Sequence, residues 1–213
     1  TTGFGAEAGV QYSYSLPKEY ILNLGATYRM KSKISGNLQR YAYAAGASIA
    51  DTIAESGSQS KLYIPAKIAV GASLRKGDKF MVGLDYERQD WSKTNFMPTS
   101  GVAFSSATAQ SIRTGIEYIP NKYDVRYYMK RVTYRAGLHY DRSYVKLDGT
   151  SVDGFGITFG MAFPLNMLNN TLNFSVDMGQ RGKNKGNLVR ERYINFIFSL
   201  NLHDIWFIKP MYN

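Results

Sequence analysis

The sequence predicts an all-β protein, an antiparallel transmembrane β-barrel, and three observations lead to this prediction. Large apolar residues recur at every second position in nine segments, as at Phe155, Ile157, Phe159, Met161 and Phe163. No helical spacing extends over a comparable length, and no run of about 18 apolar residues is present. The glycines inside these segments all stand on the polar side of the alternation. A period of two places one face of each strand in an apolar medium and the other in a polar one.

The nine segments are expected to form strands that differ in the length of their connections. The strands are expected near residues 3–14, 19–30, 62–74, 79–90, 108–118, 130–141, 153–163, 170–179 and 190–202. Connections are short at 15–18, 75–78 and 164–169, intermediate at 119–129, and longer at 31–61, 91–107, 142–152 and 180–189. Because outer-membrane barrels have short periplasmic turns and long outer loops, Pro17 and Asn166 are expected on the periplasmic side.

The glycines also distinguish a membrane barrel from a soluble barrel of lipocalin type, whose apolar residues point inward. Glycine on a solvated outer face would weaken the strand without gain, whereas on a crowded concave face it makes room for Arg29, Arg113 and Arg135. The apolar face carries bulky residues, and tyrosines near strand ends resemble an interfacial girdle. These tyrosines are Tyr12, Tyr14, Tyr28, Tyr86, Tyr118, Tyr140 and Tyr193. The sequence therefore favours a barrel surrounded by lipid in the outer membrane of a Gram-negative bacterium.

The composition excludes several classes of site. The sequence has no cysteine, which excludes disulfides, thiolate metal sites and cysteine nucleophiles. Its formal net charge of +10 indicates an anionic partner, either nucleic acid or a phosphate-rich membrane surface. Nucleic-acid binding would need aromatic residues interleaved with the basic ones, and here the aromatic residues face lipid. We therefore expect a membrane partner and no nucleic acid.

Charged residues of both signs fall on the polar face and are candidates to line the lumen. They are Glu7, Arg29, Lys67, Asp85, Glu87, Arg113, Glu117, Arg135, His139, Asp141 and Asp177. One interpretation is that they guide a substrate through the barrel. The alternative is that they pair across neighbouring strands and rigidify a wet interior, with Arg113 and Glu117 near Arg135 and Asp141 as one network.

A second basic cluster surrounds the last long connection. Its members are Arg181, Lys183, Lys185, Arg190 and Arg192. At the outer rim of a barrel these residues are candidates to bind the phosphates of lipopolysaccharide. The alternative is that they are solvated loop residues.

The sequence offers little support for catalysis. His139 lies two residues from Asp141, so both side chains share the polar face, as in a His–Asp pair. No Gly-x-Ser-x-Gly or comparable nucleophile signature accompanies the pair. Two histidines without cysteine argue against a metal site. We expect no catalytic residues, no metal and no cofactor.

Several stretches resemble the FadL-type outer-membrane transport family. The strand that contains Pro65-Ala66 and Gly71, followed by a hairpin into Asp85-Tyr86 and Asp90-Trp91-Ser92, is similar to that family's paired P-A-x-x-x-x-G and D-Y-x-x-x-D-W-S strands. Further similar stretches are Tyr134–Tyr140, Gly179–Gly182, Arg190–Tyr193 and Trp206–Lys209. Members of the family are fourteen-stranded barrels with an N-terminal hatch, and they move hydrophobic molecules such as long-chain fatty acids.

The resemblance implies that the nine strands correspond to the C-terminal part of such a barrel, without the hatch and the first strands. The odd strand number agrees, because single-chain bacterial barrels close with even numbers; a further strand within 31–61 would instead make ten. The leading interpretation is passive transport of a hydrophobic small molecule, with any apolar pocket supplied by the missing part or by Tyr41, Tyr43 and Phe104. The alternative is a structural or scaffold subunit that binds other outer-membrane proteins in a larger complex.

Overall fold

The computed structural model describes residues 2–40, 55–94, 104–147, 149–165, 170–184 and 188–203. In these residues the regular structure is antiparallel β throughout, apart from one 3-10 turn, η1 (Tyr128–Lys130). No helix among them has the length and apolar character needed to cross a membrane.

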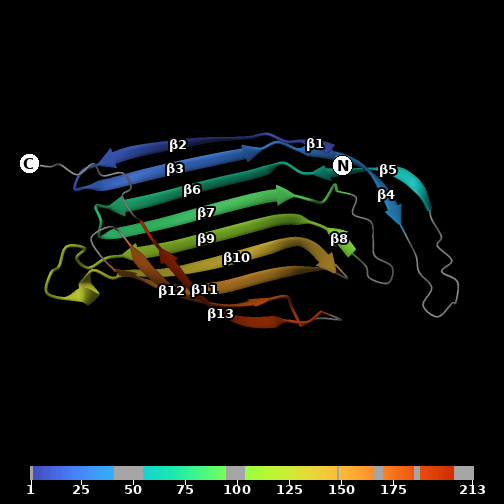
Figure 1. The fold of residues 1–213 in the computed structure, drawn as a ribbon. Helices are drawn as coiled ribbons and strands as arrows, with labels where there is room; N and C mark the ends of the chain where they lie inside the picture. Colours follow the sequence, from blue (N-terminus) through green and yellow to red (C-terminus); the bar gives the residue numbers. More distant parts are fainter. Residues whose placement is uncertain are drawn as a thin grey trace, which may run out of the picture.

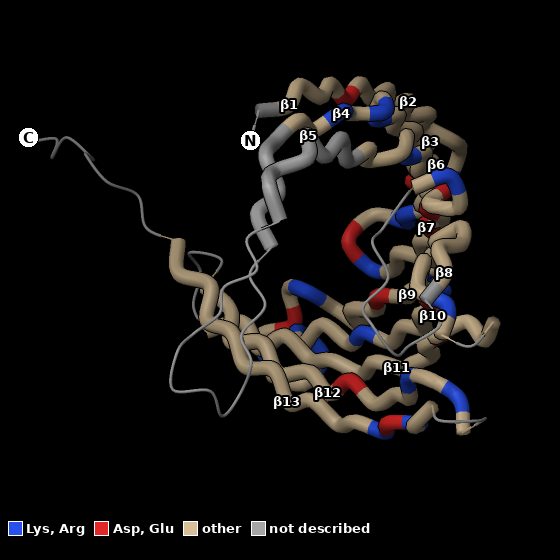
Figure 2. The backbone as a smooth tube through the Cα atoms, turned by 90° about the vertical axis from the view of Figure 1, so that its right-hand side faces the viewer, with Lys and Arg blue, Asp and Glu red and all other residues tan. Residues whose placement is uncertain are grey.

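One broad sheet makes up most of the molecule. Its strands are β2 (Glu7–Leu16), β3 (Tyr20–Arg29), β6 (Lys67–Lys76), β7 (Phe80–Asp90), β8 (Phe104–Ser106), β9 (Thr108–Tyr118), β10 (Thr133–Leu147), β11 (Thr150–Pro164), β12 (Thr171–Arg181) and β13 (Glu191–Asn201). Their order is β13-β12-β11-β10-β9-β7-β6-β3-β2, with β8 pairing only with β10. Figure 1 shows the strands side by side, and Figure 2 shows the wall curling into a C. Among the described residues β2 and β13 are not paired, so the sheet is a partial barrel that is open on one side.

The apolar residues of this wall lie on its outer surface. Among the described residues only Ala107, Val132 and Ala162 are buried hydrophobics, whereas Phe159 is 52% and Phe198 is 72% exposed. A soluble protein of this size would bury such side chains in a core. The alternation therefore produces a lipid-facing surface, as predicted, and the fold is that of an outer-membrane β-barrel wall.

Short turns join the strands at one end of the sheet, at the left in Figure 1. Between β2 and β3, Lys18 and Glu19 both have φ of 63°, the left-handed conformation that matches the twist of a tight hairpin. Between β6 and β7, Gly77 takes φ of 47°, and its N–H donates to the Glu19 carbonyl oxygen at 3.0 Å. The two turns are therefore held together directly.

The connection at 31–61, predicted as a long loop, instead contains strands at 32–40 and 55–61. A second sheet, β1-β4-β5, consists of β1 (Thr2–Phe4), β4 (Ser32–Arg40) and β5 (Glu55–Ile64). Its strands continue β2, β3 and β6 beyond short breaks, and β4 and β5 extend past the end of the main sheet (Figure 1). β4 and β5 pair with each other in antiparallel register. Polar residues and glycine occupy most positions of both strands, so the alternation of large apolar residues did not predict them.

The connection at 142–152, also predicted as a longer loop, is a tight hairpin. β10 continues to Leu147, and β11 begins at Thr150, directly opposite it. Gly149 has φ of 72° in the turn between them. Within the connection 91–107, β8 adds a third strand to this corner by pairing Ser106 with Val145. Polar residues at strand ends hide these extensions from a search for alternating apolar residues.

Candidate functional site

The concave face of the wall carries the polar side of the alternation. One hollow in it has a volume of about 840 Å³ and is lined by Asn23, Ser73, Asp85, Glu87 and Arg113, among others. A neighbouring hollow of about 570 Å³ shares Glu87, Ser111 and Arg113 with the first. It extends the lining across His139 and Asp141 to Arg181 and Tyr193. Five of the predicted lumen candidates, from strands far apart in sequence, thus line these two hollows of the concave face, the inner wall: Asp85, Glu87, Arg113, His139 and Asp141.

Several of the charged residues on the inner wall form ion pairs across neighbouring strands. Glu7 and Arg29 stand directly opposite each other on β2 and β3 and approach to 2.6 Å. Glu117 and Arg135 do the same on β9 and β10 at 2.8 Å. The other two cross-strand pairs are Lys67–Glu87 at 2.9 Å and Arg113–Asp141 at 3.1 Å. The network expected around Arg113 and Arg135 is therefore two separate pairs, and the inner wall largely neutralises its own charge.

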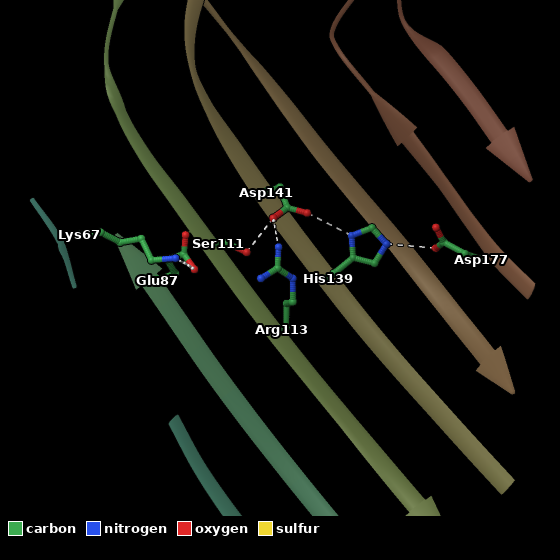
Figure 3. A network of polar contacts seen from close by, with 7 residues as sticks. All are labelled: Lys67, Glu87, Ser111, Arg113, His139, Asp141 and Asp177. Atoms are coloured by element: carbon green, nitrogen blue, oxygen red, sulfur yellow. Dashed lines mark hydrogen bonds and ion pairs between the residues drawn. The ribbon is translucent and has the colours of Figure 1, made fainter. Parts of the chain in front are cut away.

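His139 is the centre of the most extended polar cluster (Figure 3). Its Nδ1 lies 3.3 Å from Asp141 Oδ2, and its Nε2 lies 3.1 Å from Asp177 Oδ1. Ser111 Oγ donates to Asp141 Oδ1 at 2.6 Å, and Arg113 donates to the same oxygen at 3.1 Å. A neutral imidazole has one N–H and can donate to only one of the two carboxylates, whereas the imidazolium donates to both. The cluster joins β9, β10 and β12 into one hydrogen-bonded unit.

A glycine allows His139 to reach a strand that is not its neighbour. Gly156 of β11 stands opposite His139, and a Cβ atom on Gly156 would overlap the imidazole ring. Because Gly156 has no side chain, the ring lies over β11 and contacts Asp177 on β12. The space above Gly156 is thus used by His139, and the space above Gly71 by Asp85, rather than by the long arginines that the sequence predicted. Arg135 does stand opposite Gly160.

Tyr193 uses a second glycine in the same way. It stands opposite Gly179 on β12, and its Oη lies 2.5 Å from where a Cβ atom of Gly179 would be. Tyr193 lines the inner hollow, so its predicted place in the outward tyrosine girdle is wrong. Its sequence parity with Asn195 and Ser199 already carried this information.

The cluster does not have the geometry of a catalytic triad. Ser111 contacts Asp141 and not His139, so its hydroxyl is not placed to lose a proton to the imidazole. The residues that the structure describes contain no group of three or more His, Cys, Asp or Glu side chains arranged to hold a metal ion. The inner wall is suited to holding strands together and to presenting a polar surface.

The basic cluster around the last long connection divides between the two faces. Arg181 lines the inner hollow, whereas Lys183 and Arg190 line a separate recess of about 530 Å³ that includes the outward residues Tyr140 and Phe155. Arg192 stands opposite Gln180, two positions from outward-facing Ile194. Lys185 lies outside the described residues.

Two residues that the sequence search did not select belong to these sites. Ser111 shares the parity of Arg113 on β9, so the alternation itself could have identified it. Asp153 forms an ion pair with Lys183 at 2.8 Å, and no spacing in the sequence indicates this contact. Of the aromatic residues predicted to supply an apolar pocket, Tyr41 and Tyr43 lie outside the described residues, and only the backbone of Phe104 is described.

Comparison with known proteins now assigns the family. The sequence model of the BamG family matches residues 1–213, and the chain belongs to that family. No curated protein matches the sequence.

Two solved structures are similar to this chain, and the first of them shares its fold. One is described as the CymD monoaromatic hydrocarbon channel, with TM-score 0.53 and 21% identity over 95% of this chain and 52% of that one. The other is the toluene transporter TbuX of Ralstonia pickettii, with TM-score 0.49 and 19% identity over 93% of this chain and 47% of that one. The chain spans about half the length of these two structures. At the level of the fold, CymD agrees with the predicted resemblance to hydrophobic-compound channels, while the matching family has a different name from the one predicted.

Proposed function

We propose that this chain forms part of the wall of an outer-membrane β-barrel, and that this barrel is a structural subunit of a larger outer-membrane protein complex. The family name BamG hints at membership of such a complex. The observation that carries the proposal is the inner wall, where charged side chains of the described residues pair with one another across neighbouring strands.

The small size of the inward side chains supports the same conclusion. Gly83, Gly115 and Gly137 lie side by side on β7, β9 and β10, and Ser13, Asn23 and Ser73 continue this row across β2, β3 and β6. Hydrophobic ligands are held by apolar and aromatic linings with few polar groups. This part of the wall supplies a lining of glycine and polar groups.

The test is to tag the full-length protein in its native outer membrane, extract it in mild detergent and determine the mass of the species that contains it. We expect a defined assembly well above the mass of the barrel alone, and loss of assembly partners from the membrane when the protein is depleted. A species with the mass of the lone barrel, together with an unchanged outer-membrane protein profile after depletion, would contradict the proposal.

A second candidate is passive transport of hydrophobic small molecules such as long-chain fatty acids. It is favoured by the fold shared with the CymD monoaromatic hydrocarbon channel. Depletion would then reduce uptake of a labelled fatty acid or aromatic hydrocarbon and leave the outer-membrane protein profile unchanged. Uptake and the outer-membrane protein profile, measured in the same depleted cells, therefore separate the two functions.

A further inference from the structure

The outward face changes from apolar to charged along one line of residues. Tyr86, Ile112, Tyr140 and Phe155 stand side by side on β7, β9, β10 and β11. Two positions further toward the long connections, the same face carries the row Arg88, Gln110, Arg142 and Asp153. For a wall that faces lipid, this step marks the depth at which acyl chains give way to headgroups.

The recess on the outer side lies at this step. Its lining includes the aromatic residues Tyr140 and Phe155 from below the step and Lys183, Asn184 and Arg190 from above it. The recess therefore offers an apolar floor and a cationic, hydrogen-bonding rim within a volume of about 530 Å³. A ligand that fits both parts must itself be amphiphilic, with an anionic head.

The backbone fixes one side of the rim. Gly182 has φ of 81°, and its N–H donates to the Asp153 carbonyl oxygen at 2.8 Å, which turns the chain back toward β11. Lys183 Nζ then reaches Asp153 Oδ2 at 2.8 Å, and Arg142 Nε lies 4.0 Å from Asp153 Oδ1. Asp153 thereby positions two cations, and its side chain is itself only 16% exposed.

The charge at this rim is strongly positive. Around the step the outward side carries the cations Arg88, Arg142, Lys183, Arg190 and Arg192 and the carboxylates Asp90 and Asp153. Arg88 lies near the Asp90 carboxylate, whereas Arg190 and Arg192 form no ion pair within the described part of the chain, so the charges of these two arginines are available to a ligand. Several guanidinium groups beside one ammonium are suited to phosphate, which accepts bidentate hydrogen bonds from arginine.

We infer that this recess binds the phosphorylated sugar head of lipopolysaccharide, with an acyl chain against Tyr140 and Phe155 and a phosphate between Lys183 and Arg190. The long connections are expected on the outer side of the membrane, where this glycolipid is the anionic amphiphile. The inference rests on the outer-membrane location in the proposed function but not on membership of a complex. The inference also removes one residue from the predicted lipopolysaccharide-binding cluster, because Arg181 faces the lumen and does not line the recess.

The test uses the full-length protein in detergent micelles. A variant with both Lys183→Gln and Arg190→Gln is compared with the unaltered protein and with Arg181→Gln, the matched control. The probe is fluorescent rough-type lipopolysaccharide, measured beside the same material after enzymatic dephosphorylation and beside phosphatidylglycerol. We expect the double substitution to weaken binding by about tenfold or more, since charged hydrogen bonds are lost, and the control to leave it unchanged. Dephosphorylation should weaken binding to the unaltered protein to a similar degree.

Folding is checked by heat-dependent gel migration, and Arg190→Gln alone is the second variant because Arg190 forms no ion pair with any described residue. A severalfold loss is expected for it. Equal binding by the double variant and the control would overturn the inference. So would undiminished binding of dephosphorylated lipopolysaccharide. The assignment to a glycolipid would be overturned if phosphatidylglycerol bound as tightly as lipopolysaccharide and its binding depended equally on Lys183 and Arg190. None of these results depends on whether the protein enters a complex.

Discussion

The two faces of β11 are stabilised in different ways. Its outward face carries Phe155 and Phe159, whose side chains need only an apolar solvent. Its inward face carries Gly154 and Gly156, and Gly156 matters because His139 lies above it. The outer face therefore tolerates any large apolar residue and rejects charge, whereas parts of the inner face tolerate charge and reject bulk.

The largest difference between the faces is expected for an arginine placed in the middle of β11. Phe159→Arg should reduce the free energy of unfolding in phospholipid vesicles by roughly 2–4 kcal/mol, because it places a charge against lipid near the midplane. Phe196→Arg should reduce the free energy of unfolding by a similar amount. Urea titration of the refolded protein provides the measurement.

Thr158→Arg is the control, because Thr158 is the adjacent residue on the inner face and stands opposite Asp177. An arginine there can pair with that carboxylate, so a change within about 1 kcal/mol is expected. If the two substitutions ranked the other way, β11 would be facing water on its aromatic side.

A smaller effect is expected from bulk added on the inner face. Gly156→Ala should cost about 1–3 kcal/mol, because the new Cβ displaces the imidazole ring and separates His139 Nε2 from Asp177. Gly154→Ala is the matched control on the same strand and face, where the nearest atom to a Cβ is the Gln180 carbonyl oxygen at 3.6 Å. Its cost should stay within about 0.5 kcal/mol. Equal costs for the two variants would show that the ring does not depend on the glycine.

The cross-strand ion pairs are expected to contribute less individually. In the pair Arg135–Glu117 the side chains are 49% and 23% exposed, so solvent screens their attraction. A double-mutant cycle with Arg135→Gln and Glu117→Gln should give a coupling free energy of about 0.2–1 kcal/mol. A coupling several times larger would indicate that the inner wall is drier than the structure shows.

The smallest effect should be local, in the connection between β9 and β10. Asp124 accepts hydrogen bonds from the backbone N–H groups of Tyr127 and Arg126 at 2.7 and 2.9 Å. The Tyr127 N–H bond, with further help from Lys130, lowers the pKa of Asp124 below its ordinary value. Stability from this carboxylate is therefore present above its unfolded pKa and is lost as the pH falls through the lower folded pKa.

Hydrogen exchange tests this at the Tyr127 amide. We expect its protection factor, corrected for the intrinsic exchange rate, to be retained near pH 5 and to decline in more acidic solution. Asp124→Ala should remove the protection of the Tyr127 amide both near pH 5 and in more acidic solution, while the amides of β9 and β10 stay protected. Protection that is independent of both pH and Asp124 would contradict the assignment.

The extent of prediction can be judged from individual elements. The alternation in β11, β12 and β13 is a local property, so the sequence alone predicted these strands and the face that each residue takes. The alternation did not predict β4 and most of β5, since polar residues and glycine occupy most of their positions. Tyr193 was also predicted on the outer face although the parity of the strand pointed inward.

The sequence by itself determined that this is a β wall with an apolar outer face and a small, charged inner face. Only the tertiary structure decided which charges meet, because ion-pair partners depend on strand adjacency and register, which no single segment encodes. His139 contacts Asp177 across an intervening strand because Gly156 lies between them. Lys183 likewise separates from the inner-wall residue Arg181, because the turn at Gly182 lies between them.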